Sequence, residues 1–251
     1  MDIGKVIEKL QPIHHDPYFR FNEDEHSYYY GWQKLQGATG WIHKNFVHEF
    51  DEDFYSKKVA LREGVSQEEI LEKWAVKNKF ARDLGHCVHD FIENYIQDSN
   101  HPMPVGPEGS MGMILQWIMW YNSVMRPKRK NLFPEVRLNG LPSFPNAGTA
   151  DDPFWSIAKN GVVVNDWKTN EKFTTDDDFA FNQLKYPFHN FKENKHNIYS
   201  IQISLYRLML EANGIPTVGG MITWIPRKGA PQVFETKDFR GKLREYLKIQ
   251  E

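Results

Sequence analysis

Cysteine is almost absent from this chain of 251 residues, in which Cys87 is the only one. A single thiol cannot close a disulfide within the chain, so the sequence excludes a disulfide-stapled secreted scaffold and favours a reducing compartment. The sequence also lacks any apolar run near the roughly 20 residues that a membrane-spanning helix needs. Its first residues, Met1 to Lys5, carry no pattern of a secretory signal. We therefore expect a cytoplasmic protein without a membrane partner.

A large excess of charge of either sign is missing as well. The chain has 31 lysines and arginines against 33 aspartates and glutamates, which gives a net charge of −2. This balance counts against an extended nucleic-acid coat, although a local basic channel is compatible with it. Candidate basic patches are the run 126–130 and the group Lys185, His189, Lys192, Lys195 and His196. Each of them is explained equally well as a solvated surface run.

The chain also has no internal repeats and no low-complexity linker, and 14% of its residues are aromatic. This composition is typical of a folded protein, and a chain of this length is most economically one domain. Periodicity and capping signals predict a helix that begins at Ser66, helices over 84–96, 111–124 and 197–213, and strands over 132–138, 147–157, 161–168 and 218–225. Residues 173–194 lack a clear period and are predicted to form a lid or loop with a helical portion. Helices before and after the strands predict an α/β fold in which a central mixed β-sheet is flanked by helices.

The predicted strand 161–168 ends in Asp166-Trp167-Lys168. Side chains two residues apart in a strand point to the same face, so Asp166 and Lys168 project together and Trp167 points away. A turn at 159–161 would fold this strand back on the preceding one and bring Asp151 beside Asp166. Two carboxylates and one lysine suit a hard divalent cation and anionic oxygens. The alternative is a surface hairpin with a simple charge pair.

Three further motifs accompany this group. Gly85, His89 and Glu93 lie four residues apart on a predicted helix, Gln202 and Tyr206 share one face of a later helix, and Thr169 follows Lys168. Together with Asp151, Asp166 and Lys168, these motifs resemble the PD-(D/E)XK nuclease superfamily, in particular its RecB-like, phage-type exonuclease branch. The resemblance covers roughly residues 20 to 225, and the segments 26–30 and 38–40 are similar to the opening of such enzymes.

The resemblance implies a restriction-endonuclease-like core with an N-terminal helical and hairpin elaboration. Residues 1–251 would form a single nuclease domain, with the elaboration at 1–65 and the nuclease core at 66–251. The first acidic motif lacks its usual proline, and its spacing from Gly148 favours Asp151 over the adjacent Asp152. Relatives that hold an iron–sulfur cluster need four cysteines, so Cys87 alone excludes that cluster.

The resemblance also assigns roles to individual residues. Asp151, Asp166 and Lys168 would be catalytic; His89, Asp151, Asp166 and the backbone carbonyl of Trp167 would hold Mg²⁺ or Mn²⁺; and Glu93, Glu135, Gln202 and Tyr206 would support the site or bind DNA. For Glu135, a ligand of a second metal and a simple edge-strand charge are equally good interpretations. His89 on an amphipathic helix is alternatively a satisfied boundary residue, and Tyr206 alternatively caps the core.

The expected function is metal-dependent hydrolysis of DNA from its ends, in phage or mobile-element recombination, repair or degradation, and thus in the host cell cytoplasm if the protein is viral. The expected partners are single-stranded DNA or strand ends, with a recombinase, a single-strand-binding protein or a helicase as a possible second partner. One alternative is a structure-specific endonuclease with the same chemistry. The other is a non-catalytic nucleic-acid-binding accessory protein that keeps the fold.

Overall fold

The structure is a computed structural model that describes residues 1–23, 25, 27–173, 175 and 182–249. The helices are α1 (Ile3–His14), α2 (Ala38–Phe46), α3 (Glu52–Glu63), α4 (Gln67–Gln97), α5 (Ser110–Trp120), α6 (Lys195–Ala212) and α7 (Arg240–Leu247). The strands are β1 (Phe19–Asn22), β2 (Ser27–Tyr30), β3 (Gln33–Gly37), β4 (Arg129–Asn131), β5 (Val136–Asn139), β6 (Asn146–Ala150), β7 (Asp152–Ser156), β8 (Gly161–Lys168), β9 (Thr217–Trp224) and β10 (Gln232–Glu235). A π-helical turn, Tyr121–Met125, follows α5.

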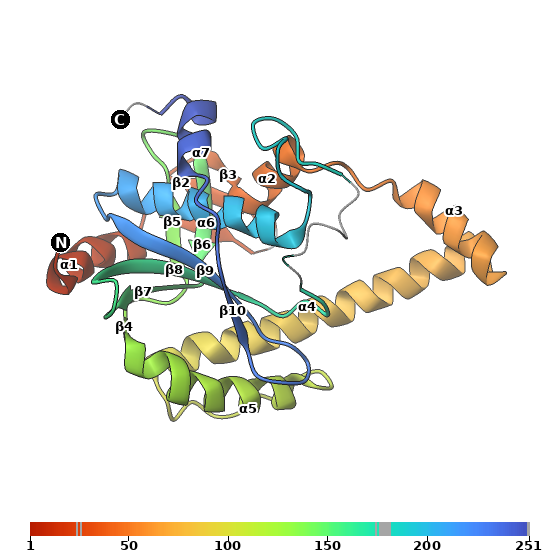
Figure 1. The fold of residues 1–251 in the computed structure, drawn as a ribbon, viewed down its shortest axis with the longest axis horizontal. Coiled ribbons are helices and arrows are strands. Elements are labelled where there is room, and N and C mark those ends of the chain that lie inside the picture. Colours follow the sequence, from red (N-terminus) through yellow and green to blue (C-terminus); the bar gives the residue numbers. More distant parts are fainter. Residues whose placement is uncertain (24, 26, 174, 176–181, 250–251) are drawn as a thin grey trace.

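The strands form two mixed sheets that are flanked by helices (Figure 1). The order is β1-β2-β3-β6-β5 in the first sheet and β10-β9-β8-β7-β4 in the second. In the described part of the chain, the β3–β6 and β8–β9 pairs are parallel, and the other strand pairs are antiparallel. The predicted α/β class with mixed strands between helices is therefore confirmed, although the strands are divided between two sheets.

The division between the sheets falls at Asp151. Strand β6 ends at Ala150, where it pairs with Val136 of β5. Strand β7 begins at Asp152, which lies opposite Asn165 of β8. The predicted single strand 147–157 is thus two strands that pair with different partners. Asp151 occupies the break and belongs to neither ladder.

The β7–β8 hairpin agrees with the predicted one. Its turn contains Asn160, whose φ of 47° is the left-handed conformation that asparagine tolerates better than most residues. Strand β8 is buried from Gly161 to Trp167 and becomes partly exposed only at Lys168. Its valines alternate between two cores, because Val162 and Val164 pack in the cluster around α6 whereas Val163 packs in the cluster around α4 and α5. The site-bearing strand is therefore fixed on both faces.

Helices cover the two faces of this β8-centred sheet (Figure 1). Helix α6 supplies Ile201, Ile203 and Leu205 to one core. Helices α4 and α5 supply Val88 and Trp117 to the other. The predicted helix over 197–213 is confirmed by α6.

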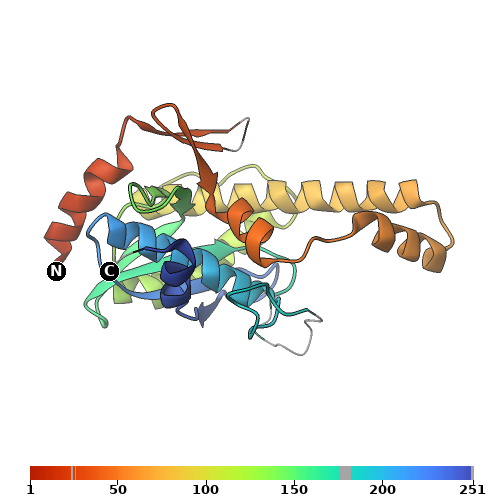
Figure 2. The same cartoon turned by 90° about the horizontal axis from the view of Figure 1, so that it is seen from above.

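Helix α4 is one continuous helix of 31 residues, so the prediction of two separate helices at 66 and 84–96 was wrong. It begins where the sequence indicates, because the hydroxyl of Ser66 accepts a hydrogen bond of 3.1 Å from the Glu69 N–H. At 1.5 Å per residue it is about 46 Å long. Its first half pairs with α3, and the two helices project together from the body (Figure 2).

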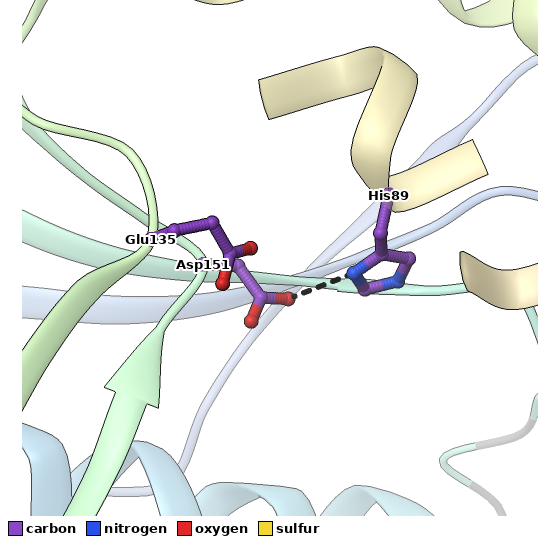
Figure 3. A group of neighbouring side chains, drawn as sticks. All are labelled: His89, Glu135 and Asp151. Atoms are coloured by element: carbon purple, nitrogen blue, oxygen red, sulfur yellow. Dashed lines mark ion pairs between the residues drawn. The ribbon is translucent and has the colours of Figure 1, made fainter. Parts of the chain in front are cut away.

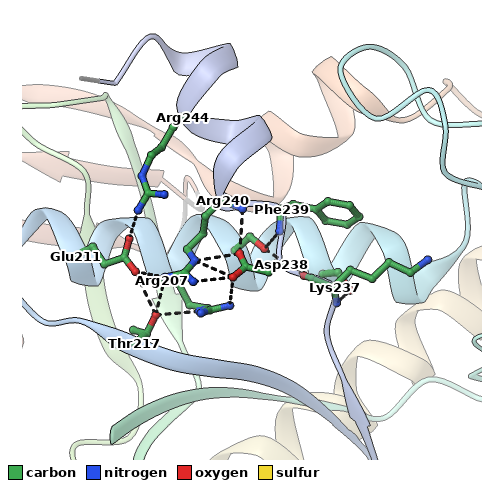
Figure 4. Close-up of polar contacts among 10 residues, drawn as sticks. Arg207, Glu211, Thr217, Lys237, Asp238, Phe239, Arg240 and Arg244 are labelled. Atoms are coloured by element: carbon green, nitrogen blue, oxygen red, sulfur yellow. Dashed lines mark hydrogen bonds and ion pairs between the residues drawn. The ribbon is translucent and has the colours of Figure 1, made fainter. Parts of the chain in front are cut away.

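The C-terminal helix α7 is pinned to α6 by an ionic network (Figure 4). Arg244 donates to Glu211 at 2.6 Å, and Arg240 contacts both Glu211 and, at 2.6 Å, Asp238. Arg207 of α6 donates through Nε to Thr217 at 2.8 Å. These contacts join α7 and the residues around it to α6, the helix that covers β8.

Part of the predicted lid or loop at 173–194 lies outside the described residues, namely 174 and 176–181. The described residues 182–194 form turns and an isolated bridge between Gln183 and Lys192, with no helix among them. Phe188 anchors this segment against Phe46, with 4.8 Å between the ring centroids. In the described part of the chain, no helix combines the length and the apolar character needed to cross a bilayer.

Candidate metal centre

Three potential metal ligands converge from distant parts of the chain. His89 lies on α4, Glu135 immediately precedes β5, and Asp151 occupies the break between β6 and β7. Their side chains point toward one another (Figure 3), and one ligand atom from each lies within 4.8 Å of the other two. His89 Nδ1 is 3.6 Å from Asp151 Oδ2. The three residues line one cavity of about 790 Å³ that is open to solvent.

Asp151 is fixed by two backbone contacts. Its Oδ2 accepts a hydrogen bond of 2.9 Å from the N–H of Trp167, and its carbonyl oxygen accepts one of 2.9 Å from the N–H of Glu135. The first bond ties Asp151 to β8 and the second ties it to the segment before β5. Asp151 thus connects β8, which carries Asp166, with the segment that carries Glu135.

The adjacent Asp152 has a different environment. It is buried, and Arg129 donates two hydrogen bonds to its carboxylate, of 2.6 and 2.5 Å. Asn165 Nδ2 donates a third of 3.2 Å. The charge of Asp152 is thus neutralised inside the fold by Arg129, and Asp152 does not join the group of His89, Glu135 and Asp151.

Asp166 and Lys168 lie on the same face of β8 and form an ion pair, as the strand periodicity predicts. Trp167 points to the opposite side, where its ring meets Trp117 edge-on with centroids 5.7 Å apart. The Lys168 ammonium also lies 4.6 Å from the ring centroid of Tyr199 on α6. Asp166 is paired with Lys168 rather than grouped with the three converging ligands, and its role as a ligand stays a prediction.

The carboxyl groups of this site repel one another. Burial, together with the charges of Asp166 and Glu135, raises the pKa of Asp151 well above its usual value. Burial and the charge of Glu93 raise the pKa of Glu135 to about 8. Several acids therefore share a space in which their charges are incompletely balanced, and a divalent cation would balance them.

The basic groups of the site are shifted in opposite directions. Burial and the nearby charge of Lys168 lower the pKa of His89 to about 4, so its imidazole is neutral near pH 7 and able to ligate a metal. Burial alone would lower the pKa of Lys168, but the carboxylates of Asp166 and Asp151 outweigh burial and raise it. Lys168 is therefore a permanent cation and a hydrogen-bond donor.

Glu135 adopts an uncommon backbone conformation. Its φ is 48°, in the left-handed region that residues with a Cβ rarely occupy. Such a conformation costs on the order of 1 kcal/mol, and strain of this kind concentrates at functional sites. The sequence left Glu135 undecided between a metal ligand and an edge-strand charge, and the structure places its carboxylate in the cluster with Asp151.

The remaining predicted site residues lie around this centre. Glu93 lines the same cavity one helical turn after His89, and burial raises the pKa of its carboxyl. Gln202 and Tyr206 are buried on α6, where Gln202 Nε2 donates to the Tyr206 hydroxyl at 2.8 Å. Tyr206 lines a second cavity, of about 490 Å³, beside Gly148 and the start of α2. Burial, together with the charge of Asp166, raises the pKa of Tyr206, so Tyr206 lies close to the acidic groups of the site.

Sequence reasoning missed two contributors to the site and assigned Arg129 to the wrong environment. Tyr28 lines both cavities, and its hydroxyl lies 3.0 Å from Thr149 Oγ1. Tyr199 supports Lys168, and its neighbourhood gave no local signal in the sequence. Arg129 stood in the predicted basic patch 126–130, but only 5% of it is exposed because it pairs with Asp152. Its inclusion in a DNA-binding patch was wrong.

The other predicted basic patch is also reduced by the fold. His196 is buried, and its Nε2 lies 2.9 Å from the carbonyl oxygen of Glu235. His189 and Lys195 are exposed. We therefore exclude His196 from that patch and retain the others only as a prediction.

No family model matches this chain, and a search of curated proteins finds no matching sequence. The geometry of His89, Glu135 and Asp151 is therefore the main structural indication of a function.

Proposed function

We propose that this chain is a metal-dependent deoxyribonuclease with a restriction-endonuclease-like core of the RecB-like PD-(D/E)XK branch, and that it degrades DNA from its ends. The observation that carries the proposal is the convergence of His89, Glu135 and Asp151 beside the ion pair of Asp166 and Lys168. The choice of an exonuclease follows the motif resemblance set out above. The same geometry also suits an endonuclease, and the experiment below separates the two.

The donor set fits a hard divalent ion. Two carboxylates and one imidazole lie within reach of a common centre, and the pKa values of Asp151 and Glu135 are raised by burial and then by the charges of neighbouring acids. Mg²⁺ and Mn²⁺ prefer carboxylate oxygens as ligands, and a neutral imidazole is a common additional ligand for metal ions. When bound, such an ion supplies positive charge that polarises a phosphate oxygen and lowers the pKa of water.

The side chains divide the remaining work. Asp151 is held by the Trp167 N–H, so its carboxylate is presented in a fixed orientation. His89 is neutral and contributes a nitrogen ligand without added charge. Lys168 keeps its proton, so it acts as a donor that orients the attacking water or stabilises charge developing on the phosphate, and it does not act as a general base.

The reaction needs no covalent enzyme intermediate. The oxygen of a water molecule attacks phosphorus and releases a proton to solvent, the bond from phosphorus to the leaving oxygen breaks, and the leaving oxygen takes up a proton from solvent. This displacement inverts the configuration at phosphorus. The cavity also exposes Arg82 and His86 of α4, which are suited to contact neighbouring phosphates.

The test is cleavage of end-labelled linear DNA and covalently closed circular DNA, single- and double-stranded, with Mg²⁺, Mn²⁺ or EDTA. Lys168→Ala and Asp151→Asn are compared with Lys159→Ala, which changes an exposed lysine at the turn of the same hairpin. Metal-dependent loss of linear substrates alone, abolished by the first two substitutions and kept by the third, supports the exonuclease. Cleavage of circles would replace it with an endonuclease. Folded protein that cleaves no substrate would sink the catalytic proposal.

A further inference from the structure

The small sheet formed by β1, β2 and β3 has two faces of different chemistry. Paired residues in antiparallel strands share a face, and the register places Phe21 opposite Tyr28, and Tyr28 opposite Leu35. This inner face packs toward the body, where Tyr28 meets Thr149 beside the metal centre. The same register aligns Arg20, Tyr29 and Lys34 in one row on the outer face.

The outer face combines aromatic rings with cations. Trp32, in the turn between β2 and β3, is 96% exposed. The Arg20 guanidinium lies 5.9 Å from the Trp32 ring centroid and is held there by a hydrogen bond of 3.0 Å to the Gly31 carbonyl oxygen. The Lys34 ammonium lies 5.7 Å from the Tyr29 ring centroid. Each ring is thus paired with a positive charge, and the packing of the fold does not account for the exposed tryptophan.

These residues also border a hollow that adjoins the metal centre. Arg20, Phe21, Tyr29 and Trp32 line a cavity of about 440 Å³. Phe21 lines the cavity of the metal centre as well. The two cavities therefore adjoin each other at Phe21.

We propose that this outer face binds single-stranded DNA next to the segment that enters the metal centre. A base stacks on Trp32 or Tyr29, and Arg20 and Lys34 contact the adjoining phosphates. Interleaved aromatic and basic side chains are the arrangement that binds unpaired bases, whereas duplex bases already stack on each other and offer no free face. The inference rests on the proposed nuclease function and adds to it the selection of single strands.

Glu25 provides a variant with the opposite expected effect. Its carboxylate accepts a hydrogen bond of 2.5 Å from the Tyr29 hydroxyl and lies 3.6 Å from the Lys34 ammonium. The carboxylate offsets one of the two cations and repels phosphate. Glu25→Gln therefore strengthens the binding of DNA, while Arg20→Ala and Trp32→Ala weaken it.

The test is the fluorescence anisotropy of a labelled oligothymidine titrated in EDTA, so that cleavage is not required. One stacked base contributes roughly 1–3 kcal/mol, which predicts a loss of roughly 5- to 150-fold in affinity for Trp32→Ala. The controls are Gln33→Ala, which changes the residue next to Trp32, and Phe54→Ala, which removes an exposed ring on α3. Both controls should bind like the unmodified protein, and circular dichroism verifies the fold of every variant.

The outcomes separate this proposal from the nuclease. If the protein cleaves DNA but Trp32→Ala binds oligothymidine with unchanged affinity, the outer face is not a DNA-binding surface and the nuclease stands. If Trp32→Ala loses affinity in a protein that cleaves nothing, the binding surface stands and the nuclease fails. Equal affinity for a duplex with the same dependence on Trp32 would overturn the selection of single strands. No measurable affinity of the unmodified protein for oligothymidine would overturn the proposal altogether.

Discussion

The carboxylate of Asp151 accepts a hydrogen bond of 2.9 Å from the backbone N–H of Trp167. This bond joins the break between β6 and β7 to the strand that carries Asp166 and Lys168. Asp151 is therefore a structural acceptor in addition to the charged metal ligand that we propose, and a substitution can separate the two roles.

Asp151→Asn removes the charge and keeps an oxygen that accepts the Trp167 N–H. We expect the variant to fold with a thermal midpoint at least as high as that of the unmodified protein in EDTA, because one of several repelling carboxylates is gone. Metal affinity should fall at least about tenfold, since even residues that only support a ligand contribute roughly 10- to 100-fold. Calorimetric titration with Mn²⁺ and thermal unfolding measure the two effects. Unchanged Mn²⁺ affinity would show that Asp151 is not a ligand.

The aromatic ring beneath Lys168 provides a second prediction. Tyr199 places its ring 4.6 Å from the ammonium, and its hydroxyl separately bonds Asn170 at 3.2 Å. A cation–π contact contributes roughly 0.5–2 kcal/mol, so Tyr199→Leu should lower kcat by about two- to thirtyfold. Tyr199→Phe keeps the ring and loses only the hydroxyl, and we expect kcat close to that of the unmodified protein. Equal losses in both variants would assign the effect to the bond with Asn170.

Much of the site follows from local periodicity, and the rest depends on distant contacts. The alternation of strand side chains predicted that Asp166 and Lys168 share a face and that Trp167 is buried opposite, and the structure confirms both. The partner of Asp152 was not predictable, because Arg129 is distant in sequence and stands among lysines and arginines that resemble a solvated run. The left-handed backbone of Glu135 was not predictable either, because a residue type other than glycine or asparagine gives little indication of positive φ. The two sheets likewise follow from pairing choices at Asp151 that no local pattern encodes.

The buried pair of Arg129 and Asp152 gives a prediction on stability. Both side chains are 1% exposed, and Arg129 →Met leaves the Asp152 carboxylate buried without its main partner. Removing one partner of such a pair costs roughly 3–5 kcal/mol of unfolding free energy. The double variant Arg129→Met with Asp152→Asn should recover much of that loss, because no unpaired charge is left.

Lys57→Met at the exposed pair with Asp53 is the control for the buried pair and should change the free energy of unfolding little. Chemical denaturation measures all of these, and a loss equal to that of the control would contradict the prediction.

The raised pKa of Glu135 predicts how metal and pH act together on stability. Its pKa is 4.5 without perturbation and about 8 in the folded protein, so between these values the folded state binds more protons than the unfolded state. Stability therefore falls as pH rises from about 4.5 to about 8, and Asp151 contributes in the same direction. A bound cation replaces the protons, so Mn²⁺ should raise the thermal midpoint more at about pH 8 than at about pH 5.5. Glu135→Gln should flatten the fall in EDTA and reduce the Mn²⁺ effect. A midpoint that falls equally with pH in this variant and in the unmodified protein would assign the repulsion to groups other than Glu135.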